Sequence, residues 1–401
     1  MKRIATPSRN GWEEIIASQG MSYNETDLPD GSKGSYWNEN HAYVLTMHEV
    51  ESLEEQTEQL HKMSLEAASF LSSEQYKRNS PFARMGVSAE ALEYATFSLD
   101  RNDPFLYGRF DLAYSGREGE PAKFLEYNAD TPTGLVEASI VQWYWKEHLF
   151  PELDQWNGLH EALVERFEEL KVIRGWAGQM HFAFSQDEPT GEDMVTTGYL
   201  LDCAEQAGWE SPRLIDMSEI WYNHPTKSFV NTDEQKIGNL FKLYPWEDMV
   251  GEHFGKYLVE TRPDGWLQPA WTMFLSTKML AAALWHIYPG HPNLVPAYPD
   301  EPRSMKQWVK KPLHGREGDG ITICLDDGEL ISSKTNEWGE EGYVYQEYCE
   351  LPLYTGDKGE PNYPVLGSWI IGDEAYGVGI RESDGPITDV DCRFVPNLID
   401  G

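Results

Sequence analysis

The chain has few cysteines, and none is arranged to carry chemistry. Among 401 residues only Cys203, Cys324, Cys349 and Cys392 are cysteines, and no two of them form a C-x-x-C pair. Zinc sites and thioredoxin-like sites need closely spaced thiols, so neither is expected. The scarcity favours reduced, structural thiols in a cytosolic protein. Cys349 has no histidine near it in sequence, which argues against a nucleophilic role.

The sequence also lacks positive charge and long apolar runs. Its 32 Lys and Arg stand against 67 Asp and Glu, which gives a net charge of −35 at pH 7. Such a chain repels nucleic acid and anionic membranes and favours cationic partners, although the simplest interpretation is that acidity supports solubility. No segment approaches the ~20 apolar residues of a membrane span, and the first residues hold no apolar signal region. We therefore expect a cytoplasmic protein that enters no membrane and binds no nucleic acid.

What the chain does have is a large apolar fraction and a changing pattern of elements. Hydrophobic residues make up 40% and aromatic residues 13%, enough for a folded enzyme or binding protein with more than one lobe. Helical periodicity is clear over 46–71, and strand 180–184, helix 194–208 and strand 212–215 are typical of a βαβ unit. From about 307 onward, short strands alternate with Gly, Pro and Asp, which favours antiparallel hairpins. The expected fold class is therefore mixed α/β (α+β).

Two short strand-like runs carry the most informative polar residues. Arg109 and Asp111 are spaced by two, and so are Glu126 and Asn128. Side chains on a strand alternate faces, so pairing of the two runs would bring Asp111, Glu126 and Asn128 together beside Arg109. Two carboxylates and an amide oxygen suit a hard divalent cation such as Mg²⁺, which leaves room for substrate phosphates. The alternatives are a surface strand and Asx turns.

A second polar segment begins where a strand ends. Lys311 lies at that end, and the loop after it carries Gly315, Gly318 and Gly320. Glycines let backbone N–H groups approach phosphate oxygens, and a lysine adds a point charge to the same group. The run is not a Walker A loop, and a plain hairpin with a basic edge explains it equally well. Because Lys310 and Lys311 point to opposite faces, only one should meet the phosphates.

Two later strands add candidate contacts. Gln346 and Glu347 lie in an aromatic strand and offer acceptors that suit an adenine amino group, and Tyr348 is placed to flank a base. Arg381 follows an alternating strand and could neutralise a transferring phosphoryl group. Taken alone, the first is better explained as a plain half-buried strand, and Arg381 is only an edge-strand arginine.

Together, these segments resemble the synthetase part of glutathionylspermidine synthase and its shorter bacterial relatives. The motifs are Arg-Phe-Asp (109–111), Glu-Tyr-Asn-Ala-Asp-Thr (126–131), Val-Lys-Lys-Pro (309–312), Tyr-Gln-Glu-Tyr (345–348) and Gly-Ile-Arg (379–381). The resemblance covers nearly the whole chain. It implies an ATP-grasp fold with a Rossmann-like pre-ATP-grasp lobe. It also implies an ATP-dependent C–N ligase that activates a carboxylate as an acyl-phosphate for attack by an amine.

The resemblance implies three regions and a role for each of several residues. Residues 1–165 would hold the metal motif, 166–270 the pre-ATP-grasp-like lobe, and 271–401 the C-terminal ATP-grasp lobes with lid and adenine hinge. The implied Mg²⁺ ligands are Asp111, Glu126 and Asn128, and the arginines facing the transferred phosphoryl group are Arg109 and Arg381. The implied ATP contacts are Lys311, the lid loop with Gly315 and Gly318, and the hinge residues Gln346, Glu347 and Tyr348.

The implied substrates are small molecules, a peptide-like acid and an amine such as a polyamine. Thr131 and Thr133 match positions near the peptide substrate, and Glu192 and Asp193 match an acidic pair near the polyamine. The simpler alternatives are that the threonines cap the next helix and that the acids are ordinary charges at a helix N-terminus. The expected cofactors are ATP and Mg²⁺.

The chain departs from the family pattern at three points. It starts too late for an N-terminal amidase domain, so no hydrolase activity is expected. A second ATP lysine has no clear match before Tyr343, and Lys334 is its stand-in. Arg393 stands where an acidic residue for the amine is expected, with Asp389 and Asp391 close by. An altered ATP-grasp protein that binds nucleotide or polyamine without ligating is therefore the alternative function.

Overall fold

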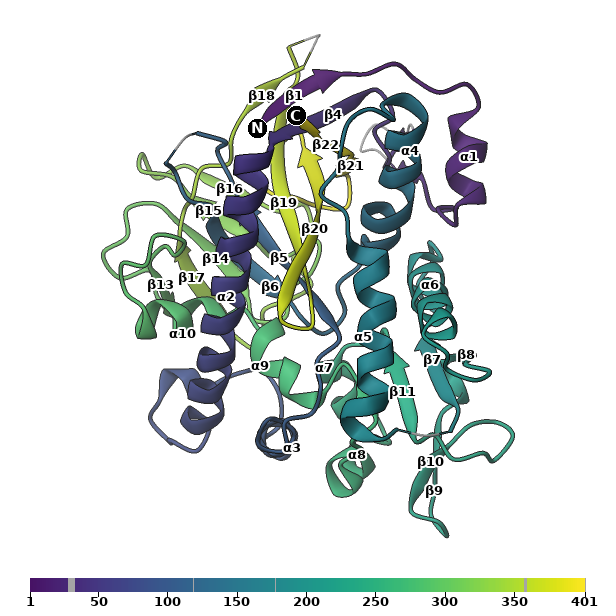
Figure 1. Cartoon of the computed structure of the whole chain (residues 1–401). Coiled ribbons are helices and arrows are strands. Elements are labelled where there is room, and N and C mark those ends of the chain that lie inside the picture. The colour runs from purple at the N-terminus through teal and green to yellow at the C-terminus, as the bar shows by residue number, and fades with distance from the viewer. Residues whose placement is uncertain (28–32, 118, 177, 357–358, 401) are drawn as a thin grey trace.

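An antiparallel sheet at the centre of the molecule joins distant parts of the chain, as the computed structural model shows (Figure 1). The structure describes residues 1–27, 33–117, 119–176, 178–356 and 359–400. The strand order is β21–β20–β19–β5–β6, and β18 pairs with β19. The strands are β5 (Tyr107–Ala113), β6 (Lys123–Asn128), β18 (Tyr354–Thr355), β19 (Pro361–Ile371), β20 (Glu374–Ser383) and β21 (Arg393–Val395).

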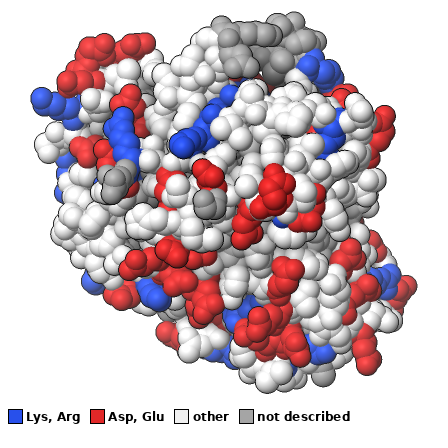
Figure 2. Space-filling model, turned by 45° about the horizontal axis from the view of Figure 1, so that its top comes forward, with Lys and Arg blue, Asp and Glu red and all other residues white. Residues whose placement is uncertain are grey.

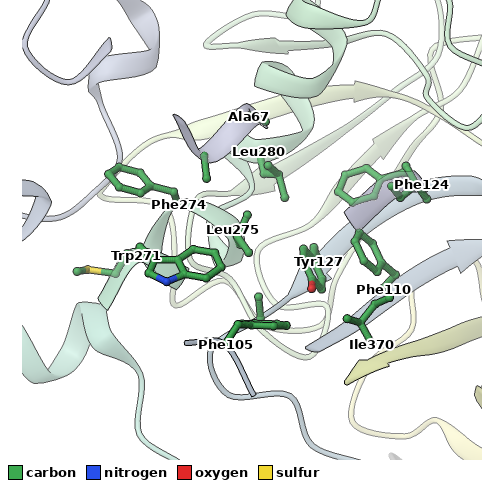
Figure 3. Packing of buried hydrophobic residues seen from close by; sticks show 14 of the residues in the cluster. Ala67, Phe105, Phe110, Phe124, Tyr127, Trp271, Phe274, Leu275, Leu280 and Ile370 are labelled. Carbon is green, nitrogen blue, oxygen red and sulfur yellow. The ribbon is translucent and has the colours of Figure 1, made fainter. Parts of the chain in front are cut away.

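The register of β5 and β6 confirms the expected convergence of the polar residues. Arg109 lies opposite Asn128, and Asp111 lies opposite Glu126. On each strand, the residue between the two polar residues points to the other face. These residues are Phe110 and Tyr127, whose rings stack with centroids 3.7 Å apart. Figure 3 shows these two rings packed in the core beside Phe124 and Ile370. Alternation therefore gives the strand pair one functional face and one core face.

Helices cover both faces of the central sheet. The long helix α2 (Met47–Glu74) and helix α5 (Leu159–Arg174) both pack against β19 and β20. Their buried residues belong to two separate cores, one containing Ile370 and the other its neighbour Trp369. Thr46 begins α2 with a capping box, since its side chain accepts from the backbone N–H of Glu49. The site-bearing strands are thus held between two packed layers.

A parallel sheet forms the expected small α/β lobe. Its order is β12–β11–β7–β8, and each pairing in it is parallel. Helix α6 (Glu192–Gln206) connects β7 to β8, so the βαβ prediction is confirmed. The strands are β7 (Met180–Phe184), β8 (Arg213–Asp216), β11 (Asn239–Lys242) and β12 (Trp266–Leu267). All of them lie inside the predicted 166–270 region.

The final third forms a second antiparallel sheet, as its turn-rich sequence predicts. Its order is β13–β17–β14–β15–β16. The strands are β13 (Ala297–Pro299), β14 (Trp308–Pro312), β15 (Thr322–Cys324), β16 (Leu330–Ser332) and β17 (Tyr343–Glu347). Within β14, the ammonium group of Lys310 lies 3.7 Å from the centroid of the Tyr343 ring, whereas Lys311 reaches the carbonyl of Leu125. The expected division of the two lysines between opposite faces is confirmed.

A three-stranded sheet ties the two ends of the chain together. In it, β4 (His41–Thr46) pairs with β1 (Lys2–Ala5) and, in parallel, with β22 (Asn397–Asp400). Two hairpin-like pairs complete the strands: β2 (Glu25–Asp27) with β3 (Lys33–Ser35), and β9 (Trp221–Asn223) with β10 (Ser228–Val230). The regions 1–165 and 271–401 are therefore not spatially separate, because strands of both share this sheet and the central one.

The remaining helical segments are short and surround the sheets. They are α1 (Trp12–Ser18), α3 (Ala89–Asp100), α4 (Gln142–Leu149), α7 (Trp246–Gly251), α8 (Gly255–Thr261), α9 (Met273–Ser276), α10 (Met279–Ile287), the π-helical turn η2 (Glu137–Val141), and the 3₁₀ turns η1 (Pro81–Ala83), η3 (Met217–Glu219) and η4 (Ala270–Thr272). Within the described residues, no helix has the length and apolar character needed to cross a bilayer. Acidic side chains outnumber basic ones over the face shown in Figure 2.

Candidate active site

One cavity of about 380 Å³ collects nearly all the predicted site residues. The central sheet, β14, β17 and the loops around residues 131 and 315 supply its walls. The predicted residues that line it are Arg109, Asp111, Glu126, Asn128, Thr131, Thr133, Asp193, Lys311, Gly315, Gly318, Gln346, Glu347, Tyr348 and Arg381. Glu192 is the sequence neighbour of the lining residue Asp193, whereas Lys334 does not line the cavity. Segments far apart in sequence thus meet at a single site.

Asp111 holds the two predicted phosphoryl-side arginines. It accepts a hydrogen bond from Arg109 Nε at 2.8 Å, and a guanidinium nitrogen of Arg381 donates to its other oxygen. Both Asp111 and Arg109 are buried. Arg109 also donates to the carbonyl of Thr133 at 2.5 Å. Because their carboxylate partner is fixed on β5, both cations are held in place before any ligand arrives.

Glu126 is surrounded by cations. Its Oε2 lies 3.1 Å from Lys278 Nζ, and Asn128 Nδ2 donates to its Oε1 at 3.0 Å. Burial acts to raise the pKa of Glu126, but the charges of Lys278 and Lys311 outweigh it and hold the pKa well below its ordinary value. Burial, together with the charge of Lys278, lowers the pKa of Lys311 to about 8 although Glu126 opposes this shift. Glu126 is therefore an ionised oxygen ligand.

Lys278 is a site residue that sequence reasoning missed, and Lys334 does not occupy the place predicted for it. Lys278 lies at the N-cap of α10 and lines the cavity beside Glu126. Lys334 is half-exposed and pairs with Asp389 at 3.0 Å and with Asp391. These two ion pairs hold the Lys334 ammonium group beside Asp389 and Asp391. The only signal for Lys278 was a lysine at the start of an apolar helix.

Replacing these two lysines should separate their roles. Lys278→Ala is expected to raise the KM for ATP by about tenfold to a hundredfold, since hydrogen bonds to charged groups contribute about 1.5–3 kcal/mol. Lys334→Ala removes only a surface ion pair, so its effect should stay below about twofold. Steady-state ATP titrations of both variants measure the difference. A larger increase of the KM for ATP in Lys334→Ala than in Lys278→Ala would support Lys334 as the second ATP lysine.

The donor set fits a hard divalent cation that arrives with phosphates. Asp111 and Glu126 supply carboxylate oxygens, and Asn128 supplies an amide oxygen from the adjacent position of the register. Among the described residues, the surrounding cations are Arg109, Arg381, Lys278 and Lys311. They outnumber the two carboxylates, so the local charge repels a bare metal ion and attracts a polyphosphate. Mg²⁺ bound together with ATP matches this balance.

The glycine-bearing loop covers the cavity and is tied to α7. Arg316 pairs with Glu247, and its Nη2 lies 3.3 Å from Asp248 Oδ2. Gly318 has φ +73°, and a Cβ there would lie 2.6 Å from the carbonyl oxygen of Thr388. Both the positive φ and the close backbone approach require glycine at this position. Gly315, Arg316, Glu317 and Gly318 thus line the cavity on a loop that is held against α7 and Thr388.

Part of the cavity lining is apolar. It includes Leu125, Val309, Ile323, Leu351 and Val365. Glu347 and Tyr348, which are predicted to contact adenine, also line the cavity. Gln346 also lines the cavity, but its side-chain amide donates to the carbonyl of Phe124 at 2.8 Å and ties β17 to β6. The side chain of Gln346 is therefore engaged within the fold, and its strand pairs with β13 on one side and β14 on the other.

Another part of the cavity lining is acidic, and we call it the acidic end. Glu188, Asp193 and Glu317 line it, and Thr131 and Thr133 form the neighbouring wall. Burial raises the pKa of Asp193 to about 7, and the charges of Glu192 and Glu188 add to the shift. Burial likewise raises the pKa of Glu192. This end suits a cation, whereas the middle of the cavity suits an anion.

A fully buried carboxyl group lies behind this acidic end. Glu137, in the π-helical turn η2, has no exposed surface, and neither of its oxygens makes a well-formed hydrogen bond. Burial raises its pKa to about 8, and the charge of Glu192 adds to this. The hydroxyl groups of Tyr23 and Tyr36 act in the opposite direction but are outweighed. Glu137 is therefore protonated at neutral pH, and sequence reasoning did not single it out.

The raised pKa of Glu137 predicts a pH-dependent stability. Because the folded protein holds this proton and the unfolded chain releases it above about pH 4.5, the group's stabilising contribution declines as pH rises to about 8. Glu137→Gln mimics the protonated form and should flatten that decline. Thermal unfolding from pH 4.5 to 8 tests this. If the difference in Tm between variant and wild type does not change over this range, Glu137 is ionised in the folded state.

Comparison with known proteins shows related sequences over the whole chain. A family model described as "Glutathionylspermidine synthase preATP-grasp" matches residues 3–400. A protein of Haemophilus influenzae named as an acid–amine ligase is 39% identical over 410 residues, covering 99% of both chains. The trypanothione synthetase of Crithidia fasciculata is 27% identical over 314 residues, which is 72% of this chain and 46% of that protein. A bifunctional glutathionylspermidine synthetase/amidase of Escherichia coli is 22% identical and matches 90% of this chain but 59% of its own length.

The fold also resembles a solved structure. A glutathione synthetase-like effector of Globodera pallida, solved in its apo form, superposes with a TM-score of 0.57 at 10% sequence identity. The alignment covers 99% of this chain and 100% of that one. At such low identity the likeness concerns the fold alone. The mixed α/β architecture is thus of the glutathione synthetase-like, ATP-grasp type, as the sequence motifs predicted.

Proposed function

Since the chain belongs to the glutathionylspermidine synthase preATP-grasp family, we propose that it is an ATP-dependent C–N ligase that joins an acid to an amine. One observation carries the proposal: a single cavity is lined by three zones of side chains, an apolar zone, a zone of cations and oxygen ligands, and an acidic zone. These three zones match an adenine base, the phosphates of ATP and a cationic amine. The relatives named as an acid–amine ligase and as synthetases support the same reaction class.

The residues of the middle zone would carry phosphoryl transfer to the acid. Lys311 and Lys278 bind the ATP phosphates, and Arg109 and Arg381 face the group in transfer and neutralise its developing charge. Asp111, Glu126 and Asn128 would hold Mg²⁺, which would supply Lewis-acid stabilisation of the charge on the phosphates. The loop around Gly318 excludes water, which would otherwise hydrolyse the acyl-phosphate.

The two substrates would enter from the acidic end. Thr131 and Thr133 present hydroxyl groups to a peptide-like acid beside Arg109, and the carboxylates around Asp193 attract an amine such as a polyamine. The acid's carboxylate oxygen attacks the γ-phosphorus of ATP, ADP leaves, and the amine then displaces phosphate from the acyl carbon. Glutathione and spermidine are the first candidates because of the family to which the chain belongs. We place this activity in the cytoplasm.

A specific observation supports one alternative, a protein that binds nucleotide without ligating. In the segment where the family has an acidic residue for the amine, Asp389 and Asp391 are paired with Lys334. Arg393 pairs with Asp384 at 2.8 Å. If the amine needs a carboxylate from this segment, ion pairs already occupy those on the described residues, and ligation would fail although ATP binds.

A phosphate-release screen decides between the two functions. Peptides, with glutathione first, are crossed with polyamines and amino acids in the presence of ATP and Mg²⁺. A ligase releases ADP and phosphate in equal amounts only when both an acid and an amine are present. Binding of a non-hydrolysable ATP analogue in calorimetry, with no ADP release for any pair, would instead establish the nucleotide-binding protein.

A further inference from the structure

A single peptide group links the phosphoryl-transfer zone to the acidic end of the cavity. The carbonyl oxygen of Thr133 accepts from Arg109 Nη1 at 2.5 Å. The N–H of the same peptide, belonging to Gly134, donates to Glu192 Oε1 at 3.2 Å. Arg109 and Glu192 are therefore held on opposite sides of one planar unit. Any group beside Glu192 that faces the cavity lies close to the point where the acyl-phosphate would form.

Asp193 is that group. It follows Glu192 at the start of α6 and lines the cavity. Its carboxylate makes no ion pair or hydrogen bond with any other described residue. Charged and titratable groups surround it on each side: Glu188 from the preceding loop, and Arg316 and Glu317 from the covering loop. The charge of Asp193 also acts to raise the pKa of Tyr107 on β5.

Glu188 and Glu192, two carboxylates shortly before Asp193 in sequence, are already engaged. Glu188 accepts the backbone N–H groups of Thr190 at 2.6 Å and Gly191 at 2.7 Å. These bonds lower its pKa although burial opposes them. Glu192 is tied to Gly134, as described above. Glu317 also lines the cavity, but it is exposed, whereas Asp193 is partly buried and burial raises its pKa to about 7. Among the described residues, Asp193 is thus the partly buried carboxylate of this end whose oxygens make no hydrogen bond or ion pair.

The buried Glu137 is a second carboxyl group that acts on this end. Glu137 has no exposed surface, and its two oxygens lack well-formed hydrogen bonds. Its charge and that of Glu192 act on each other. The hydroxyl groups of Tyr23 and Tyr36 face Glu137 and lower its pKa, but burial outweighs them. A carboxyl group buried with so little compensation is costly in its ionised form, so a proton on Glu137 offsets the cost.

The proposed reaction requires a proton acceptor at this place. Alkylamines are protonated at neutral pH, and an ammonium group has no lone pair with which to attack an acyl carbon. We propose that Asp193 accepts the proton of the amine substrate immediately before attack, and that Glu192 and Glu137 are positioning residues behind it. The inference rests on the proposed ligase function and assigns the proton acceptor in its second half-reaction.

The step balances as follows. The ammonium group donates one proton to the Asp193 carboxylate and becomes a neutral amine. Its nitrogen lone pair forms the C–N bond at the acyl carbon, and the C–O bond to phosphate breaks with its electron pair moving to phosphate. The nitrogen then loses a second proton, which the departing phosphate takes up. Asp193 returns its proton to solvent, and the products are an amide, phosphate and one released proton.

The acceptor role can be isolated with two nucleophiles. Hydroxylamine is neutral at pH 7 and needs no base to attack an acyl-phosphate, whereas spermidine is fully protonated. Asp193→Asn should lower amide formation with spermidine, or with the best amine of the screen, by about 10²–10⁴-fold, the usual weight of general base catalysis. Hydroxamate formation from the same acid with hydroxylamine should stay close to wild type. Asp193→Glu should recover part of the amine reaction.

The pH profile adds a readout that a purely structural role would not change. In wild type, Asp193 accepts the proton, so the rate with the amine levels off above the pKa of this group. In Asp193→Asn, the rate should follow the concentration of free amine and keep rising with pH. Asp187, which is exposed in the loop before α6, supplies the control. Asp187→Asn should preserve the reactions with the amine and with hydroxylamine, and the pH profile of each.

Each alternative result overturns the assignment in a recognisable way. An Asp193→Asn variant that folds like wild type but loses hydroxamate and amide formation together would place Asp193 in activation of the acid. A variant that keeps the wild-type amine rate and pH profile would exclude it as a base. Failure of the wild type to form either product with any acid would instead refute the ligase function on which the inference rests.

Discussion

Replacing Glu126 by Gln is expected to lower ADP release that depends on acid and amine by about 10²–10³-fold, the usual cost of removing one preorganised charge from an active site. Glu126 is the carboxylate on which Lys278 and Asn128 converge, and the charge of Lys311 also acts on it. The amide keeps the shape of the side chain but not its charge. Lys278 and Lys311 are then less well neutralised, and the proposed Mg²⁺ site loses one of its two carboxylates.

The measurement is a coupled ADP assay at several Mg²⁺ concentrations. The variant should need more Mg²⁺ for half-maximal turnover, and excess Mg²⁺ should restore only part of the rate. Glu120→Gln is the matched control, because Glu120 is exposed on the loop that leads into the same strand. Unchanged Mg²⁺-dependent turnover in Glu126→Gln would refute the assignment of this site.

Asp130→Ala is expected to lower the free energy of unfolding by about 3–5 kcal/mol, because it leaves a buried charge without its partner. Asp130 accepts from Lys242 Nζ at 2.5 Å and from the backbone N–H of Trp246 at 2.8 Å. The side chain of Lys242 is 0% exposed and that of Asp130 is 2% exposed. The Lys242 ammonium also lies 4.7 Å from the Trp246 ring centroid. This pair joins the end of β6 to β11 and α7.

Chemical denaturation measures the loss. The double variant Asp130→Ala with Lys242→Met should recover much of it, since no unpaired charge then remains buried. The matched surface control is Asp233→Ala, which removes an exposed pair with Arg213 and should cost less than about 1 kcal/mol. A cost as small as this for Asp130→Ala would show that water reaches Lys242 in the folded protein.

Local patterns in the sequence predicted the part of the site that lies on single strands. The spacing by two in Arg109–Asp111 and Glu126–Asn128 predicts a shared face, and the register of β5 and β6 confirms it. The same alternation separates Lys310 from Lys311. In each case the geometry follows from the backbone of one short run, so a single sequence is enough.

Contacts between distant segments could not be predicted in this way. Lys278 contacts Glu126 from another part of the chain, and no periodicity in either segment predicts this contact. Asp130 follows a strand-like run, whereas its partner Lys242 is 112 positions away. The pairing of β22 with β4 likewise joins the two ends of the chain. Such long-range pairing depends on packing, which local propensity does not encode.

The most direct test of the central claim follows one oxygen atom. The acid identified in the screen is labelled with ¹⁸O in its carboxylate and allowed to react with ATP and the amine. If the acid is activated as an acyl-phosphate, one ¹⁸O from the carboxylate must appear in the released phosphate, and only when the acid is present. Phosphate that contains no ¹⁸O from the acid, although amide forms, would contradict the proposed mechanism.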